Sequence, residues 1–193
     1  MRGRGALIVG VMVLAASLMF AGACGSDTGG GPGEVTSAQI DYDRALADAD
    51  GPLASLYQQP NELLAGGLPA FEARIDELRG YPIVVNKWAS WCGPCRAEFP
   101  FFQSQVAKHG TEIAFLAIDA QDSEEAATTF LEELPVPYPS YLDPDLEISR
   151  SLDVEREFPA TVFYDSEGEI VFVHRGGYQE EADLAADIER YAR

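Results

Sequence analysis

The sequence predicts an α/β sandwich built around a mixed β-sheet. Two short apolar runs, residues 83–90 and 113–118, have the length and composition of buried strands, and a segment of helical periodicity follows each of them. Two later strands, 161–164 and 170–174, are joined by the turn sequence DSEGE, and an amphipathic helix closes the chain. Strands that alternate with helices indicate a parallel sheet, and the closing hairpin adds antiparallel strands to it.

Two helices are predicted before the first strand. Residues 38–67 form an N-terminal extension whose role the sequence does not indicate, although residues 42–49 have the pattern of a short helix that DADGP ends. A stronger helix starts near Pro69, which suits a first helical turn, and it places Phe71 and Ile75 on one face.

Helices also follow the first two strands. The helix after the first strand carries Phe99, Phe102 and Val106 on one face, and Ser123 is a suitable N-cap for the helix after the second. The segment PVPYPSYLDPD that comes next is predicted to be a loop. Further helices are expected at residues 146–152 and 180–191.

The start of the chain has the pattern of an export signal. Arg2 and Arg4 precede an apolar run over residues 6–20, and small residues follow at a cleavage position. The run is shorter than the ~20 residues that a spanning helix prefers. A lipoprotein, a plain secreted protein and an uncleaved anchor are the alternatives, and all three place the domain outside the cytoplasm, where disulfides persist.

A cysteine at the end of this segment favours the lipoprotein. Cys24 directly follows Ala-Gly-Ala, which resembles the lipobox of bacterial lipoproteins, except that Ala21 replaces the usual leucine. Residues 1–23 are then a signal peptide of the lipoprotein type, and residues 24–37, rich in glycine, are a flexible tether. A lipidated Cys24 anchors the domain to the outer face of the cell membrane.

The charge of the chain argues against two classes of partner. The 193 residues include 32 Asp and Glu against 13 Lys and Arg, a formal net charge of −19. Phosphate contacts need clustered basic side chains, so nucleic acid is not an expected partner, and neither is an anionic lipid surface bound through a basic patch. We expect an acidic, monomeric domain.

Two of the three cysteines, Cys92 and Cys95, lie two residues apart in WCGPC, and three interpretations compete. A structural zinc site needs four ligands, but His109 and His174 do not have the spacing of a zinc finger. A structural disulfide that closes so small a loop stabilises the fold weakly. The sequence therefore favours redox chemistry by the cysteine pair, with no metal and no cofactor.

The position of the pair between a strand and a helix fits redox chemistry. A helix that begins near Cys92 places this sulfur at its positive end, which favours the thiolate. Cys92 is then the exposed nucleophile, and Cys95, one turn deeper, attacks the mixed disulfide and releases the product. Gly93 gives the turn its backbone freedom, and Pro94 fixes φ at the helix start.

Several stretches resemble a known family. WCGPC with its flanking strand and helix, together with FPAT before a later strand, resembles the thioredoxin fold, a three-layer α/β/α sandwich with a central mixed β-sheet. More narrowly, VVNKWASWCGPCRAEFP, AIDAQDSEEAATTFL and FPATVFYDSEGEIVFVHRGGY are similar to the TlpA/ResA-type extracytoplasmic thiol–disulfide oxidoreductases. The similarity covers residues 68–193, which we expect to be the thioredoxin-like domain.

The resemblance assigns roles to residues. It makes Cys92 the nucleophile and Cys95 the resolving thiol, and it matches Pro159 to the family's cis-proline, an ordinary trans turn proline being the alternative. Glu98 falls where membrane-anchored members carry a carboxylate that can relay protons to the resolving thiol, whereas the alternative is a solvated helix glutamate. The substrate groove would be lined by Trp91, Gly93, Pro94, Phe158 and Pro159.

Three residues depart from the patterns of related proteins. Asn86 stands where thioredoxin itself has a buried aspartate, so proton transfer cannot use that group. Lys87 replaces an apolar residue of the buried strand, and it is expected to reach an edge or to pair with a carboxylate, because burying it unpaired is costly. Phe158 stands before Pro159 where the family often has a small aliphatic residue, which changes the expected substrate preference.

The resemblance implies an enzyme that exchanges its dithiol or disulfide with thiol- or disulfide-containing exported proteins. Gly-Pro between the cysteines resembles the reducing members, so we expect a reductant served by a membrane electron donor, for example of the cytochrome c maturation type. The alternatives are a disulfide-donating oxidase served by a membrane oxidant, a thiol peroxidase, and a redox-silent binding lipoprotein.

Overall fold

The computed structural model of the chain describes residues 40–193. The predictions of a signal peptide over 1–23, a tether over 24–37 and lipidation at Cys24 lie outside the described residues. Within the described part, no helix is both long and apolar enough to cross a membrane.

The elements agree closely with the predicted order. The strands are β1 (Leu63–Leu64), β2 (Ile83–Trp88), β3 (Ala114–Ala120), β4 (Ser140–Asp143), β5 (Ala160–Tyr164) and β6 (Ile170–Arg175). The helices are α1 (Tyr42–Ala45), α2 (Gly51–Leu56), α3 (Gly67–Glu77), α4 (Gly93–His109), α5 (Glu124–Glu133), α6 (Glu147–Ser151) and α7 (Glu181–Tyr191).

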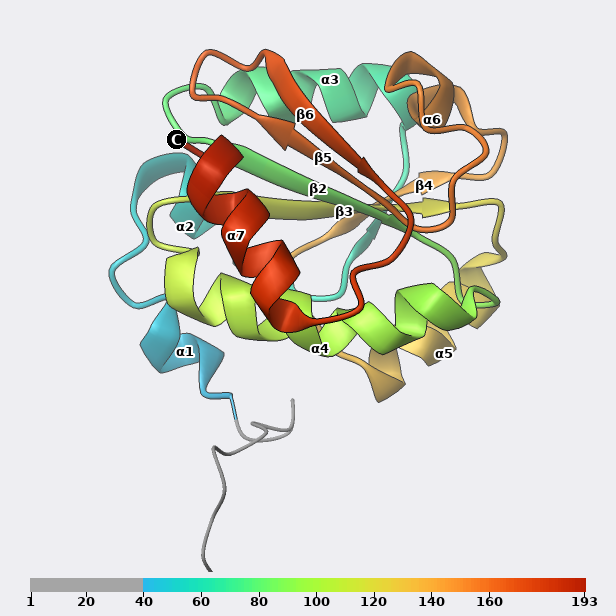
Figure 1. Cartoon of the computed structure of the whole chain (residues 1–193), viewed down its shortest axis with the longest axis horizontal. Coiled ribbons are helices and arrows are strands. Elements are labelled where there is room, and N and C mark those ends of the chain that lie inside the picture. Colours follow the sequence, from blue (N-terminus) through green and yellow to red (C-terminus); the bar gives the residue numbers. More distant parts are fainter. Residues whose placement is uncertain (1–39) are drawn as a thin grey trace, which may run out of the picture. The chain divides into compact units, whose positions relative to one another are not determined.

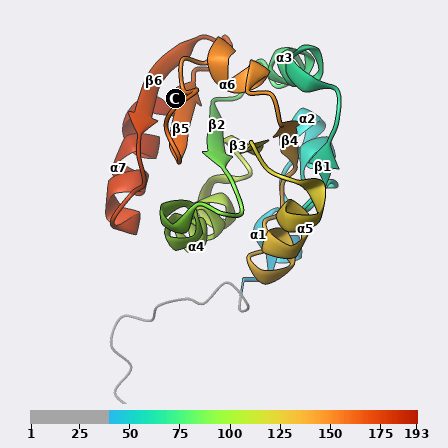
Figure 2. The same cartoon turned by 90° about the vertical axis from the view of Figure 1, so that its right-hand side faces the viewer.

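The six strands form one mixed sheet in the order β1-β4-β3-β2-β5-β6. Strands β1 to β4 pair in parallel, whereas β5 is antiparallel to β2 and β6 is antiparallel to β5. Figure 2 views the molecule from the side, with β6 and β1 at opposite edges of the sheet. The prediction of a mixed sheet is confirmed, and β2 lies where its parallel and antiparallel parts meet.

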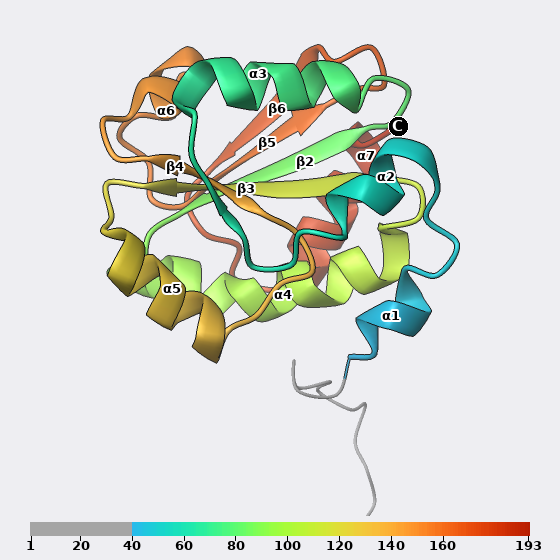
Figure 3. The same ribbon diagram turned by 180° about the vertical axis from the view of Figure 1, so that it is seen from behind.

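Helices cover both faces of the sheet, which completes the three predicted layers. Figures 1 and 3 show α3 and α6 over one face and α4, α5 and α7 over the other. Strand side chains alternate between the two resulting cores: Val84 packs with the α4 side, whereas Ile83 and Val85 pack with the α3 side. Because β2 and β3 are buried on both faces, their sequences are apolar apart from Asn86, Lys87 and Asp119.

The helix that follows β2 starts at the cysteine pair. Cys92 is the N-cap of α4, and Pro94 lies in the first turn, where a missing backbone N–H costs nothing. Phe99, Phe102 and Val106 are buried, as their spacing predicts, and they fix this helix against the sheet. The strand and the helix together hold the connecting turn rigidly.

Two local predictions are wrong. Residues 135–145, predicted as a loop because of their four prolines, contain β4, which pairs with β3 on one side and β1 on the other. The first helix ends earlier than predicted, at Ala45, and DADGP begins a second helix that was not predicted, because Pro52 lies in the first turn of α2. Leu53 and Leu56 of that helix are fully buried, so the N-terminal extension contributes to the core on the α3 side.

Candidate active site

A disulfide joins Cys92 and Cys95 at the N-terminal end of α4, with 5.3 Å between the two Cα atoms. The backbone N–H of Cys95 donates to Cys92 Sγ at 3.1 Å. Cys95 is fully buried, whereas Cys92 is 4% exposed. Cys92 is therefore the more accessible sulfur of the pair, as predicted, although in the disulfide form it is nearly enclosed rather than exposed.

The turn before the cysteines is held by the loop that follows β3. The side chain of Asp122 accepts hydrogen bonds from both the backbone N–H and the hydroxyl of Ser90, the latter at 2.9 Å. The indole N–H of Trp91 donates to the carbonyl of Gln121 at 3.0 Å. Sequence reasoning missed both loop residues, because their partners lie about thirty positions away and no local motif links them.

The segment before β5 forms the opposite side of the site. The Phe158–Pro159 peptide bond is cis, the geometry that the family resemblance implies, and Pro159 is buried. The ring of Phe158 lies 4.7 Å from that of Trp91, which is 57% exposed and forms the rim, whereas Trp88 lies in the core. A pair of aromatic rings, one exposed and one half-buried, thus borders the disulfide turn.

Gly177 lies between the two sides of the site and is a further residue that the sequence did not indicate. A Cβ atom at this position would lie 3.4 Å from Pro94, 3.5 Å from Pro159 and 3.6 Å from the carboxylate of Glu98. A Cβ at Gly177 would therefore be in van der Waals contact with the helix start, the cis-proline and the buried glutamate, and a larger side chain would compete with them for space.

Glu98 lies beneath the cysteines and is fully buried, so the alternative of a solvated helix glutamate is wrong. It lies one helical turn after Cys95, and both residues belong to the buried face of α4. Its carboxylate accepts hydrogen bonds from the side-chain amide of Asn86 at 2.8 Å and from the backbone N–H of Tyr178 at 3.0 Å. Burial raises the pKa of Glu98 to about 7, although these two hydrogen bonds lower it.

Lys87 lies on a central strand, and among residues 40–193 it forms no ion pair with a carboxylate, so the expectation for this residue is wrong. Its side chain is fully buried, and Nζ donates to the backbone carbonyls of Val154, Glu155 and Glu157 at 2.7, 3.1 and 3.0 Å. Burial lowers the pKa of Lys87 to about 8, although the charges of Asp143, Glu157 and Glu155 raise it. Backbone carbonyls therefore accept the hydrogen bonds of the ammonium, where the sequence analysis expected a carboxylate.

A second buried acid lies at the end of β3. Asp119 is 1% exposed, and neither carboxylate oxygen has a hydrogen-bond partner among residues 40–193. Burial raises its pKa to about 8, the charges of Asp122 and Asp143 act in the same direction, and so does Asp122 as an acceptor that can bond only the protonated form of Asp119. This acid faces the α4 side of the sheet, as Ala117 does two positions earlier.

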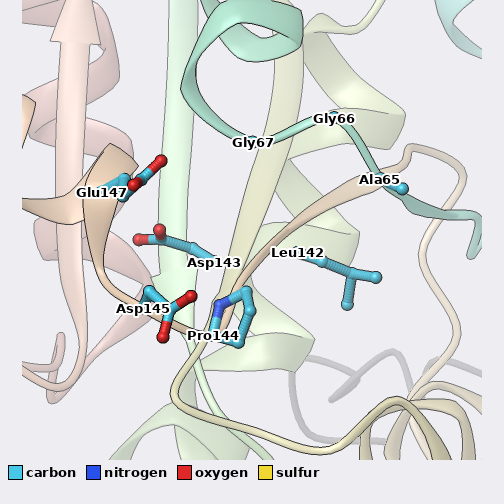
Figure 4. A pocket seen from close by; sticks show the side chains of 8 residues that line it. All are labelled: Ala65, Gly66, Gly67, Leu142, Asp143, Pro144, Asp145 and Glu147. Carbon is cyan, nitrogen blue, oxygen red and sulfur yellow. The ribbon is translucent and has the colours of Figure 1, made fainter.

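Two other hollows contain neither the cysteines nor Glu98. The first, about 300 Å³, is shown in Figure 4 and is lined by Ala65, Gly66, Gly67, Leu142, Asp143, Pro144, Asp145 and Glu147. The second, about 590 Å³, lies between α1, α2 and the segment before β4. Across the residues that the structure describes, no cluster of His, Cys, Asp or Glu side chains is arranged to hold a metal ion.

Comparison with known proteins places this geometry in a family. The Redoxin family model matches residues 68–188. The chain is 28% identical to the thiol-disulfide oxidoreductase ResA of Halalkalibacterium halodurans over 136 residues, which cover 69% of this chain and 76% of that protein. It is 33% identical to ResA of Bacillus subtilis over 106 residues, which cover 53% of this chain and 57% of that protein.

A solved structure agrees with these relatives. A secreted disulfide oxidoreductase of Mycobacterium tuberculosis, described as homologous to DsbE of Escherichia coli, has a TM-score of 0.52 and 25% identity. The match covers 60% of this chain and 85% of that one. A disulfide between two cysteines separated by Gly-Pro at a helix start, the two ResA relatives and this shared fold lead to one conclusion: the chain belongs to the Redoxin family, as a thiol–disulfide oxidoreductase of the TlpA/ResA type.

Proposed function

We propose that this protein reduces disulfides in exported proteins, outside the cytoplasm, and that a membrane electron donor returns it to the dithiol form. The observation that carries the proposal is the Cys92–Cys95 disulfide at the start of α4, with Glu98 buried one turn below it. The export signal at the start of the sequence and the secreted relative support the location.

The reaction is a pair of thiol–disulfide exchanges. The Cys92 thiolate attacks one sulfur of the substrate disulfide, a mixed disulfide forms, and the other substrate sulfur leaves as a thiolate that takes up a proton. Cys95 then loses its proton to the Glu98 carboxylate and attacks Cys92 Sγ, which breaks the mixed disulfide. The second substrate sulfur leaves as a thiolate and takes up a proton, from the protonated Glu98 or from water. The substrate has then gained two electrons and two protons at the expense of the two cysteine thiols, which are joined in the Cys92–Cys95 disulfide.

The surroundings of the cysteines support the reducing direction. A couple becomes oxidising when its reduced form is stabilised, chiefly through the thiolate of the nucleophilic cysteine. Among the described residues, Cys92 Sγ accepts one hydrogen bond, from the N–H of Cys95. The ionised carboxylate of Glu98, buried on the same helix face, opposes a second negative charge at the sulfurs. The N-terminus of α4 favours the Cys92 thiolate, and the Glu98 charge opposes that effect. Together with Gly-Pro between the cysteines, this balance favours a low potential.

The groove for the substrate follows from the same geometry. We assign it to the segment from Trp91 to Pro94 on one side and to Phe158 and Pro159 on the other. The exposed face of Trp91 and the half-buried ring of Phe158 offer an apolar contact beside the reacting sulfur. Lipidation of Cys24 would hold this groove close to the membrane surface.

The reduction potential of the Cys92–Cys95 couple is the direct test. The chain is equilibrated with glutathione and dithiothreitol buffers, and its dithiol fraction is measured. A value near the −270 mV of thioredoxin is expected for a reductant, whereas a value near the roughly −120 mV of DsbA would assign the oxidase alternative. A protein that forms no reversible disulfide in any buffer would contradict both directions.

Trapping identifies the client proteins. The Cys95→Ser variant cannot resolve the mixed disulfide, so it should retain exported proteins on Cys92 that are released by dithiothreitol. Cys92→Ser is the matched control and should retain none. Equal capture by the two variants would show that the captured proteins do not report on exchange at Cys92.

A further inference from the structure

The buried ammonium of Lys87 has no part in the chemistry above. Lys87 lies on β2 and is fully buried, and only one other lysine, Lys108, occurs in the chain. A buried charge is costly and is retained where its surroundings satisfy it. The contacts of Lys87 show which part of the molecule the charge stabilises.

The hydrogen bonds of Lys87 all go to one segment. An ammonium has three N–H donors, and here all three are satisfied by the carbonyls of Val154, Glu155 and Glu157. Within residues 40–193, no backbone N–H outside the helices and strands donates to these carbonyls. The Lys87 ammonium therefore holds, from the interior of the domain, the segment that leads to the cis-proline.

The same nitrogen also lies against the groove. Lys87 Nζ is 3.6 Å from the centroid of the Phe158 ring, within the range of a cation–π contact. The Phe158 ring in turn lies 4.7 Å from that of Trp91. Because β2 continues through Trp88 into the turn that carries Cys92, one strand holds the disulfide directly and the opposite side of the groove through Lys87.

We propose that Lys87 is a positioning residue for the substrate groove, which holds residues 154–158 in the conformation that receives a protein disulfide beside Pro159. The inference rests on the proposed function, because it assumes that protein disulfides approach Cys92 at this groove. Under this proposal, Lys87 affects the binding of protein substrates. A small disulfide needs only the two sulfurs of the site, so its reaction does not depend on Lys87.

The contacts on the outer side of the segment cannot replace the ammonium. Arg175 pairs with Asp153 at 2.8 Å and with Glu157 at 3.5 Å, and the side chains of Arg175 and Asp153 are 41% and 96% exposed. Exposed ion pairs contribute little because water and salt screen them. These pairs touch the outer edge of the segment, whereas Lys87 holds its carbonyls from within.

Lys87→Met tests the proposal, because it keeps the length and apolar stem of the side chain and removes the three donors. The KM for reduction of a protein disulfide such as insulin should rise about tenfold, equivalent to about 1.4 kcal/mol of binding. The reduction potential and the rate with oxidised glutathione should stay at the values of the unaltered protein. Lys108→Met, the same change at the exposed end of α4, should alter none of these quantities.

Two results have distinct meanings. If the unaltered protein exchanges with insulin and Lys87→Met leaves its KM unchanged, the positioning role is overturned while the proposed function stands. If the unaltered protein does not exchange with protein disulfides at all, both the proposed function and this inference fail. Equal losses with insulin and with oxidised glutathione would also overturn the positioning role, because they would indicate general damage to the site.

A measurement on the unaltered chain covers the case in which Lys87→Met does not fold. A neutral amine has two N–H groups for three carbonyls, and Asp143, Glu155 and Glu157 are the acidic groups whose charges act on Lys87. NMR of the two lysines follows the loss of the proton from Lys87. As this proton is lost, the kcat/KM for insulin should fall relative to the kcat/KM for oxidised glutathione. A constant ratio through that titration would overturn the proposal.

Discussion

At the scale of single residues, Glu98 is the group that links the fold to the chemistry. Its carboxylate is fully buried, is fixed by Asn86 and Tyr178, and lies one helical turn after the resolving Cys95. A pKa raised to about 7 lets it accept and return a proton near neutral pH. The hydrogen bonds aim the carboxylate, and burial sets its basicity.

Replacement of Glu98 by glutamine should remove the acidic limb of the pH profile of the rate. The carboxylate is the form that accepts a proton from Cys95, so the rate of resolution should fall as pH drops below about 7 in the unaltered protein. Glu98→Gln should lower kcat about 100-fold at neutral pH and abolish that limb. Glu133→Gln, on the exposed carboxylate that pairs with Arg96, is the control. A limb that persists in Glu98→Gln would show that another group carries the proton.

Gly177 gives a steric prediction at the same scale. A Cβ at this position would already touch Pro94 and Pro159, so the branched side chain of valine has no room between them. Gly177→Val should push the cis-proline away from the helix start and lower kcat/KM for insulin by roughly tenfold or more. Kinetics and far-UV circular dichroism separate this from misfolding. Full activity in a folded Gly177→Val protein would refute the close-approach argument.

The sequence identified the cysteines but not what surrounds them. Cys92, Cys95 and Pro94 belong to a local motif, whose chemistry follows from residue type and spacing. The burial of Glu98 depends on Tyr178, eighty positions later, and the contact at Gly177 depends on how β6 returns to the helix start. Such contacts leave no local pattern, so only the folded chain reveals them.

At the scale of secondary structure, prediction succeeded where an element carries its own pattern. The buried run of β2 and the helical face of α4 were both recognisable, and their order implied the mixed sheet. It failed for β4 and α2, because the prolines of PVPYPSYLDPD and the Gly-Pro of DADGP are typical of loops and helix ends. The short elements are stabilised by pairing and burial, both of which are set by distant parts of the chain.

The N-terminal extension packs against the end of α4, and this contact should contribute to the stability of the fold. Gly110 ends α4, and a Cβ there would clash with the side chain of Leu46, just after α1, and lie 2.6 Å from the carbonyl of Val106. Gly110→Ala should therefore lower the free energy of unfolding by roughly 1–3 kcal/mol, measured by urea denaturation. Gly93→Ala, where no atom lies within 4 Å of the added Cβ, should change it by less than about 0.5 kcal/mol. Equal stability of the two variants would mean that the extension moves aside without cost.

At the scale of the whole molecule, buried acids make stability depend on pH in an unusual direction. The chain carries a net charge of −19, and its buried acids include Glu98 and Asp119. Both have pKa values raised in the fold, to about 7 and about 8. Between the unfolded pKa of roughly 4 and these values, the folded state binds more protons than the unfolded one. Their contribution to stability is therefore present at low pH and is lost as pH rises.

Asp119 is the sharper test of this dependence, because no hydrogen bond compensates its charge within the described part of the chain. Below pH ~4 its carboxyl is neutral in both states, whereas above pH ~8 the fold must hold an unpaired carboxylate among Asp122 and Asp143. Asp119→Asn removes that charge with little change in shape, so it should raise the free energy of unfolding by at least about 1 kcal/mol above pH ~8 and leave it nearly unchanged below pH ~4. Urea denaturation of both proteins across this range measures the difference. Two curves that stay parallel at every pH would show that Asp119 is ionised in the fold and stabilised by a contact other than those described.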